Sequence, residues 1–483
     1  MEATSISQSK DMIIELIKQP LFEKIEEACS DIEEALSKGS VNLATQTIKD
    51  LSSWFEDLVW TAYLTSLFQC AKILEWLRML GSKKAMKFVS YQQVWISLPT
   101  GTKIQIRSPF FVKAAPKRGR KKRGPQGRGE HLLLSLMGFI HKVERALAFY
   151  AIQLAVLVPS FEIASRILNQ EGIQLSPNKI RRLVEEVKSP DLCSRVKRLL
   201  GEEEDGLFEG KRVLIAVDGG RLRQRKNKRG PIPKGNKQRG FHSDWIEPKL
   251  FTLYVIDENG EIVKEIAPFV DGTTGKVRQF IELLEHYLIH LGIERALEVV
   301  LLGDGAPWIW DRIPKLIMSV GGDDVKLTEI IDWTHAKQNL NKAFETLSAK
   351  KQAKVNFEYF KNLLFSGQIM KIVTELKELL NVRASSKIIK KLKSYFIPNI
   401  CRMQYEINRA MKLPIGSGVI ESAIRRVINL RLKSPGSFWK LDFAETMLYL
   451  RAQVLYGRWE NLKNNWTKLI LNDFRLIAMA CPI

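Results

Sequence analysis

The chain has 483 residues, a formal net charge of +22 and 45% hydrophobic residues. This hydrophobic content excludes a basic disordered tail, and the length suggests roughly three domains of ~150 residues each. A charge excess of this size predicts a polyanionic partner.

The cysteines and the hydropathy pattern bear on location. The five cysteines are scattered and show no CxxC spacing, which argues against disulfides and structural zinc and predicts a cytoplasmic protein. The first residues lack a basic region followed by an apolar one, so no signal peptide is expected. No apolar stretch reaches ~20 residues without charges, so no membrane span is expected.

The N-terminal region, residues 1–112, combines helices with a β-hairpin. Residues 1–85 show helical periodicity. Segments 91–98 and 103–106 alternate in polarity around a Pro-Thr-Gly turn, which predicts two paired strands.

A basic linker, residues 113–130, follows. It carries seven cations and no acid between Lys117 and Gly129, so it cannot pack on its own. Such a run is either a solvated linker or an arm that contacts phosphates, and we favour the arm. The expected DNA contacts are Lys117, Arg118, Arg120, Lys121, Lys122 and Arg123.

Residues 131–205 are expected to form a helix-turn-helix DNA-binding domain. Ser160 can cap one helix, and Ser176 with Pro177 at the first helical position can open a second that ends near Glu186. Two short helices around a glycine turn are typical of DNA-binding motifs, but also of ordinary helical hairpins. The second helix is expected to bind DNA through Lys179, Arg181 and Arg182.

From residue 211 the sequence becomes rich in strand signals. The expected strands are 212–218, 249–256, 261–267, 298–303 and 328–332, with a helix at 275–292. Residues 338–412 are helical in pattern and are expected to be an all-α insertion. The catalytic domain would then consist of residues 206–337 and 413–483, the latter ending in C-terminal helices.

A second basic run, residues 221–239, lies between the first two strands and holds nine cations and no acid. A solvated loop is the ordinary explanation for such a run. Its position beside the acidic residues described next favours a clamp on the DNA backbone. The residues expected to contact DNA are Arg221, Arg223, Arg225 and Lys226.

Three acidic residues occupy positions where a carboxylate is costly to bury. Asp218 closes the apolar run 213–217, Asp304 closes the run 299–303, and Glu421 lies in the first turn of a helix. A strand-end Asp-Gly pair is often only a turn. Three acids in this order instead predict a divalent-metal site for phosphoryl chemistry, because a metal offsets the cost of burial.

Further motifs, together with these acids, resemble the DDE transposases of insertion sequences. Asp332-Trp-Thr-His335 is similar to the (C/D)xxH signature after the fifth strand. Residues 302–310 are similar to the second-Asp motif, and residues 416–423 to the Glu motif, of the ISKra4- and ISLre2-like groups. The resemblance implies an α/β fold with an RNase H-like mixed five-stranded sheet and flanking helices. To this fold the sequence adds the all-α insertion and a mainly helical N-terminal region containing the β-hairpin and the helix-turn-helix.

The resemblance also implies the activity, cleavage and strand transfer at the ends of an insertion sequence. Asp218, Asp304 and Glu421 would hold two Mg²⁺ ions, for which Mn²⁺ can substitute, and His335 would orient the site. Asp332 is placed outside the triad, and Glu445 is the alternative third ligand. Arg425 and Arg426, with Arg431 and Lys433, are expected to extend a basic face.

The implied partner is double-stranded DNA, both the terminal repeats of the element and the target. A homodimer or higher oligomer on DNA is expected, in the cytoplasm of a prokaryote and associated with its nucleoid, without contact with a membrane. Two alternatives stay open: an RNase H-like endonuclease or resolvase that only hydrolyses, and a domesticated copy of a transposase that only binds DNA.

Overall fold

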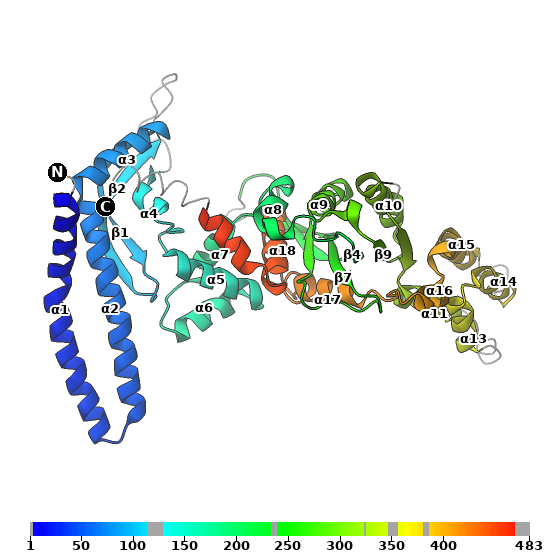
Figure 1. Ribbon diagram of the computed structural model, residues 1–483, viewed down its shortest axis with the longest axis horizontal. Helices are drawn as coiled ribbons and strands as arrows, with labels where there is room; N and C mark the ends of the chain where they lie inside the picture. Colours follow the sequence, from blue (N-terminus) through cyan, green and yellow to red (C-terminus); the bar gives the residue numbers. More distant parts are fainter. Residues whose placement is uncertain are drawn as a thin grey trace. The chain divides into compact units, whose positions relative to one another are not determined.

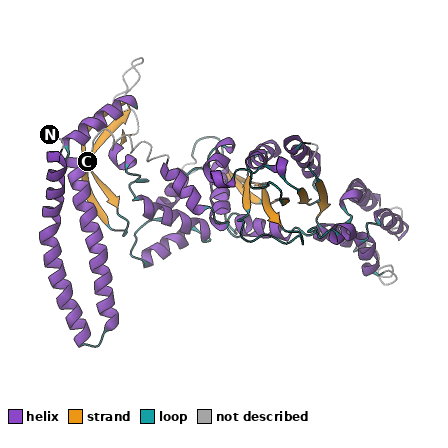
Figure 2. Cartoon of the chain, in the orientation of Figure 1, coloured by secondary structure: helices purple, strands orange, loops and turns teal. Residues whose placement is uncertain are grey.

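The structure is a computed structural model that describes residues 3–113, 129–232, 235, 239–322, 325–345, 356–379 and 386–468. The chain divides into two compact units, Met1–Glu186 with Lys463–Ile483, and Val187–Leu462. The domain boundaries expected from the sequence stay a prediction. Figures 1 and 2 show the helices and strands of each unit.

The first unit opens with two long helices, α1 (Ala3–Ser37) and α2 (Val41–Gln69), which pack against each other. α3 (Ala71–Lys83) leads into the predicted hairpin, β1 (Met86–Ser97) and β2 (Lys103–Lys113), to which the short β3 (Gly129–Glu130) adds a third strand. The core lies between α2, α3 and the buried face of this sheet, which contributes Val94, Ile96 and Ile106. Helical periodicity and period-two alternation therefore predicted these elements correctly.

Four further helices follow along the first unit: α4 (Leu132–Leu136), α5 (Arg145–Leu157), α6 (Phe161–Gln170) and α7 (Pro177–Glu186). The Ser160 hydroxyl caps α6 by accepting from the Ile163 N–H, as its position in the sequence predicted. α6 and α7 pack together and against α5. The helical pair at 161–186 is confirmed, while its role on DNA stays a prediction.

The second unit is built on a mixed five-stranded sheet. Its strands are β4 (Arg212–Gly219), β7 (Lys249–Ile256), β8 (Phe269–Thr273), β9 (Glu298–Gly303) and β10 (Leu327–Ile331), in the spatial order β10-β9-β4-β7-β8. β4, β7 and β8 pair antiparallel, whereas β4, β9 and β10 are parallel. The apolar runs of β4 and β9 are buried throughout, as expected for central strands covered on both faces.

Helices pack against this sheet and position its edges. α8 (Leu192–Leu199) packs on α9 (Val277–His290), α9 contacts β7, β8 and α10 (Pro307–Gly321), and α18 (Leu441–Leu455) packs on β8. α17 (Gly418–Ala423), which continues into the π-helix η4 (Ile424–Asn429), lies on β4 and β7. The sheet and these helices are visible in Figure 2.

The third strand is not where the sequence predicted it. Residues 261–267 form turns, with one isolated bridge from Ile262 to Ile256, and the strand begins at Phe269. The earlier segment carries exposed charges that would have to point into a covered sheet. β8 escaped detection because Asp271 and Gly272 interrupt its apolar pattern.

The expected insertion is helical in its described residues. It comprises α11 (Trp333–Phe344), α13 (Phe357–Phe365), α14 (Ile369–Leu379), α15 (Ser386–Phe396), the 3₁₀-helix η3 (Ile397–Arg402) and α16 (Tyr405–Ala410). Two more 3₁₀ turns, η1 (Glu202–Glu204) and η2 (Ile293–Arg295), belong to the second unit. None of the described helices combines the length and the apolar character needed to span a bilayer.

Candidate active site

Three acidic residues follow the carboxyl ends of three neighbouring parallel strands. Gly303 of β9 pairs with Val217 of β4 and with Ile331 of β10. The next residue on each strand is an acid: Asp218, Asp304 and Asp332. Because neighbouring strands lie ~4.8 Å apart, the register places these acids in one row at one edge of the sheet.

Asp218 is half-buried, and its carboxylate accepts from the Gly219 N–H at 2.7 Å. The pKa of Asp218 is raised to about 6, chiefly by burial and also by the charges of Asp304 and Glu421, against the opposing effects of Gly219 and His335. Asp218 is therefore coupled electrostatically to Asp304 and to Glu421. That these three acids form one catalytic triad stays a prediction.

Asp304 is held by a turn that forms immediately after β9. Its Oδ1 accepts from the Ala306 N–H at 2.8 Å, and its backbone oxygen accepts from Trp310 Nε1 at 2.7 Å. Gly305 lies between Asp304 and Ala306. A glycine is required there because a Cβ would lie 2.1 Å from the Tyr395 ring. Burial raises the pKa of Tyr395, and Asp304 and Asp332 raise it further, so the insertion places a phenol beside the acids.

Asp332 connects the fifth strand, the insertion and the helix of Glu421. Its carboxylate accepts from the His335 N–H at 2.6 Å, from His335 Nδ1 at 2.9 Å and from the Ser417 N–H at 2.5 Å. Burial alone would raise the pKa of Asp332, but these hydrogen bonds lower it below its ordinary value. Asp332 is fully buried at this junction, while its place outside the triad stays a prediction.

His335 lies at the start of α11 and faces the acids. Its hydrogen bond with Asp332 raises the pKa of His335, burial opposes this, and the charges of Asp332, Asp218 and Asp304 raise it further. The DxxH spacing thus puts a carboxylate cap at the helix start and the imidazole one turn later.

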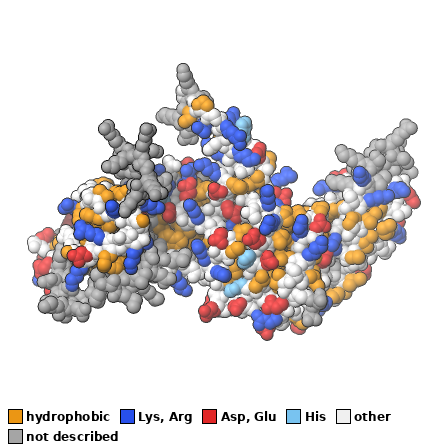
Figure 3. Space-filling model, turned by 90° about the horizontal axis from the view of Figure 1, so that it is seen from above, with side chains coloured by type: hydrophobic (Ala, Val, Ile, Leu, Met, Phe, Trp, Pro, Cys, Tyr) orange, Lys and Arg blue, Asp and Glu red, His pale blue; other side chains and the backbone are white. Residues whose placement is uncertain are grey.

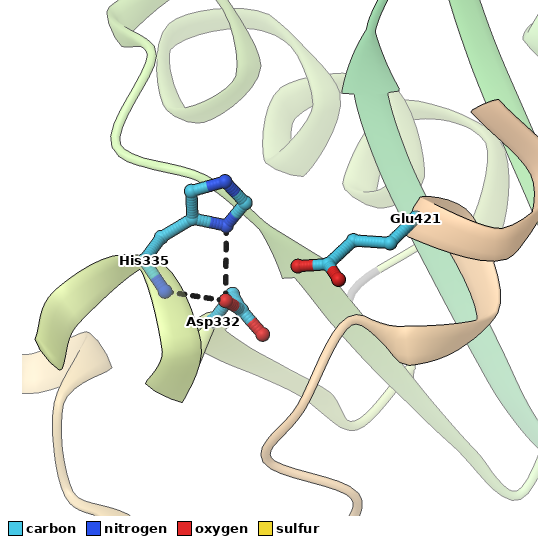
Figure 4. Close-up of side chains that lie close together, drawn as sticks. All are labelled: Asp332, His335 and Glu421. Atoms are coloured by element: carbon cyan, nitrogen blue, oxygen red, sulfur yellow. Dashed lines mark hydrogen bonds and ion pairs between the residues drawn. The ribbon is translucent and has the colours of Figure 1, made fainter. Parts of the chain in front are cut away.

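Glu421 approaches the same point from α17. Figure 4 shows its carboxylate directed toward the Asp332–His335 pair. Its Oε1 accepts from the Ser417 hydroxyl at 3.3 Å. One potential ligand atom from each of Asp332, His335 and Glu421 lies within 4.8 Å of the others, so these residues could share a metal ion. This geometric group shares only Glu421 with the triad predicted from the sequence.

Glu445 is not a substitute for Glu421. Its carboxylate accepts from Arg195 and, at 2.6 Å, from the Thr274 N–H. Arg195 also pairs with Asp271 at 3.0 Å, which makes a buried network beside β8. No local pattern in the sequence predicts this network, because its members lie on α8, β8 and α18.

The second basic run is not a simple loop. It contains β5 (Leu222–Asn227), which pairs antiparallel with β6 (Phe241–Ile246). The Arg223 guanidinium lies 4.9 Å from the centre of the Trp245 ring, and that of Arg225 lies 4.4 Å from Phe241. Arg221 and Arg223 are exposed. A solvated loop, the alternative explanation, does not describe residues 222–227, where cation–π stacking compensates for the low strand propensity of the segment. The favoured role, a clamp on the DNA backbone, stays a prediction.

The other predicted DNA contacts differ in how far they are exposed to solvent. Arg425 and Arg426 are exposed, whereas Arg431 is buried against Trp439 and does not extend their basic face. Over the face shown in Figure 3, basic side chains are interspersed with other types. The arm residues Lys117, Arg118, Arg120, Lys121, Lys122 and Arg123 lie outside the described residues.

The helix α7 presents only part of its predicted basic face. Arg181 and Arg182 are exposed, and Arg181 pairs with Glu185 at 3.4 Å. Lys179 is folded back, where its ammonium donates to the His141 backbone oxygen. The Lys179 side chain is thus directed away from the exposed side chains of Arg181 and Arg182.

Comparison with known proteins adds little. No protein-family model and no curated protein matches the chain. Among solved structures, the chain is similar to the Drosophila P element transposase strand transfer complex, with 14% identity, a TM-score of 0.28, and coverage of 66% of this chain and 80% of that one. A TM-score this low carries no argument, so the proposal below rests on the residues of this chain.

Proposed function

We propose that this chain is a DDE transposase, which cleaves DNA at the ends of an insertion sequence and joins the freed 3′-hydroxyl to target DNA. The observation that carries the proposal is the raised pKa of Asp218, which burial, with smaller contributions from the charges of Asp304 and Glu421, brings to about 6. A carboxyl group with this property is typical of a functional site.

The sheet supports an RNase H-like assignment. Three consecutive strands, β4, β7 and β8, pair antiparallel, and β9 and β10 then add in parallel on the other side of β4. This arrangement brings the first and fourth strands side by side. An acid after each of them can therefore act on one substrate atom.

The donor set fits a hard divalent cation. Asp218, Asp304 and Glu421 offer only carboxylate oxygens, the ligands that Mg²⁺ and Mn²⁺ prefer. Their repulsion is tolerable when a metal balances it. When bound, Mg²⁺ would neutralise charge on the phosphate oxygens and lower the pKa of the attacking water or hydroxyl.

Asp332 is better explained as a positioning residue than as a ligand. Three N–H donors already take most of the acceptor positions of its carboxylate. By accepting from Ser417, it fixes the start of the helix that carries Glu421. By accepting from His335 Nδ1, it orients the ring and leaves Nε2 for a phosphate oxygen. The raised pKa of His335 favours the charged, donating form.

The proposed partner is DNA. We propose that the protein binds it as a homodimer or higher oligomer, in a prokaryotic cytoplasm. The net charge of +22 supports a polyanion. Arg221, Arg223, Arg425 and Arg426 are the exposed cations nearest in sequence to Asp218 and Glu421. Their proximity to the acids in the chain supports contacts with the phosphates that flank the cleaved bond.

The test is incubation of the protein with labelled linear DNA that carries candidate element ends, in Mg²⁺, Ca²⁺ or EDTA. Joined products in Mg²⁺ support transposition. Nicked products alone would favour a nuclease or resolvase, and a mobility shift without chemistry would favour a protein that only binds DNA. Glu421→Gln should abolish cleavage and joining, while the exposed Glu406→Gln on α16 serves as the matched control.

A further inference from the structure

A cavity of about 830 Å³ lies within the first unit, between the β1–β2 hairpin and the start of α7. Its lining includes Trp95, Lys103, Lys142, Ser176 and Lys179. No acidic residue is among the lining residues, all of which belong to the described part of the chain. The charged side chains that line the cavity are therefore all positive, and none of the acids of the candidate active site is among them.

Among the described residues, none of the three lysines forms a salt bridge with a carboxylate. Burial lowers the pKa of Lys179, and the charges of Lys142, Arg182 and Lys103 lower it further. In the described residues, Glu186 on the same helix pairs with His141 at 3.2 Å instead of with a lysine. Like charges gathered in this way destabilise the protein unless an anion joins them.

The backbone is strained where it presents Lys142. His141 and Lys142 have φ values of 49° and 68°, in the left-handed region that favours glycine or asparagine. The turn is closed by reciprocal hydrogen bonds between Ile140 and Val143, and the Lys142 oxygen accepts from the Ser97 N–H at 2.9 Å. A lysine at such a position is consistent with a function for its side chain.

We propose that this cavity binds phosphodiester groups of a nucleic-acid strand. The three ammonium groups supply the charge, and the Ser176 hydroxyl adds a neutral donor. Trp95 is 59% exposed at the rim and offers a ring on which a base can stack. The volume exceeds that of a single phosphate ion, and the stacking surface favours a nucleotide strand over an inorganic anion. The site is independent of the metal chemistry proposed for Asp218, Asp304 and Glu421.

The decisive variant is Lys142→Gly in the full chain. Glycine relieves the left-handed strain, so thermal stability should be equal or higher, while one phosphate contact is lost. The slope of log K against log salt for a labelled duplex should then flatten by about 0.9. Lys49→Gln on α2, an exposed cation outside the cavity, is the matched control and should leave the slope less affected. An unchanged slope and affinity for Lys142→Gly would overturn the proposal.

Protection of lysines from acetylation, read by mass spectrometry, locates the ligand and separates its sources. Duplex or single-stranded DNA should protect Lys103 and Lys142 but not Lys49. Equal protection by inorganic phosphate at the same phosphate concentration would show a small-anion site and refute the nucleic-acid assignment. Because Glu421→Gln should leave this protection intact, failure of the catalytic proposal and failure of this one are distinguishable.

Discussion

Replacing Asp218 with asparagine should change how the stability of the protein depends on pH. The pKa of Asp218 is raised from 3.8 to about 6, so the folded protein holds this proton more tightly than the unfolded chain does. Below pH 3.8 Asp218 is protonated in both the folded and the unfolded state, so it does not lower the free energy of unfolding. Between pH 3.8 and 6 the unfolded chain releases its proton first, so stability is lost as the pH rises, and above pH 6 the loss is complete.

The magnitude follows from the shift. Each pKa step of one corresponds to about 1.4 kcal/mol, so ionised Asp218 should lower the free energy of unfolding by about 3 kcal/mol above pH 6. Asp218→Asn removes this charge with little change in shape. In EDTA the variant should therefore exceed the parent in stability by up to about 3 kcal/mol at neutral pH, and the difference should vanish near pH 4.

The assay is urea denaturation at a series of pH values, in EDTA and in Mg²⁺. Mg²⁺ should stabilise the parent above pH 6 and stabilise Asp218→Asn less, because the metal binds only the folded, ionised site. Asp311→Asn, at an exposed position on α10, is the control and should leave the pH dependence unchanged. The reasoning is refuted if Asp218→Asn and the parent lose stability in parallel between pH 4 and 6.

Four further predictions follow from other contacts. Asp332→Asn should destabilise the fold by ~1–3 kcal/mol, because one amide cannot accept from all three donors, and NMR titration should show a lower pKa for His335. Arg195→Met should cost ~3–5 kcal/mol in urea denaturation, because it leaves buried carboxylates without their partner. Arg223→Gln should flatten the salt dependence of DNA binding by up to about 0.9, measured by fluorescence anisotropy. Arg181→Ala should cost ~1–3 kcal/mol on element ends alone if this side chain contacts a guanine, measured by competition against random DNA.

The sequence predicted the central strands because their signal is local. The strands at 249–256 and 298–303 are continuous apolar runs, and burial on both faces requires such runs. β8 could not be found in this way, since its Asp271 is tolerable only with Arg195 from α8 beside it. The β5 strand was hidden for a related reason, because its arginines stack on rings that lie about twenty residues later.

The acids themselves were predictable, but the division of roles among them was not. Asp218 and Asp304 could be found from the strands that precede them, and Glu421 from its helix start. That Asp332 reaches Ser417, 85 residues further along the chain, depends on the fold of the intervening insertion. No local pattern encodes such a contact.

Two sets of residues thus compete for a metal, and hydrogen bonding discriminates between them. Proximity alone selects Asp332, His335 and Glu421. However, the carboxylate of Asp332 already accepts from three N–H groups, which leave it about one further acceptor position and lower its pKa against the effect of burial. Asp218 has the opposite property: burial and neighbouring acids raise its pKa, so a cation would relieve its environment. The cost of burying an ionised carboxylate is therefore found at Asp218. The hydrogen bonds that position the neighbouring groups are found at Asp332. These properties support the proposal that a metal would bind at Asp218 and Glu421, with Asp332 and His335 as positioning residues.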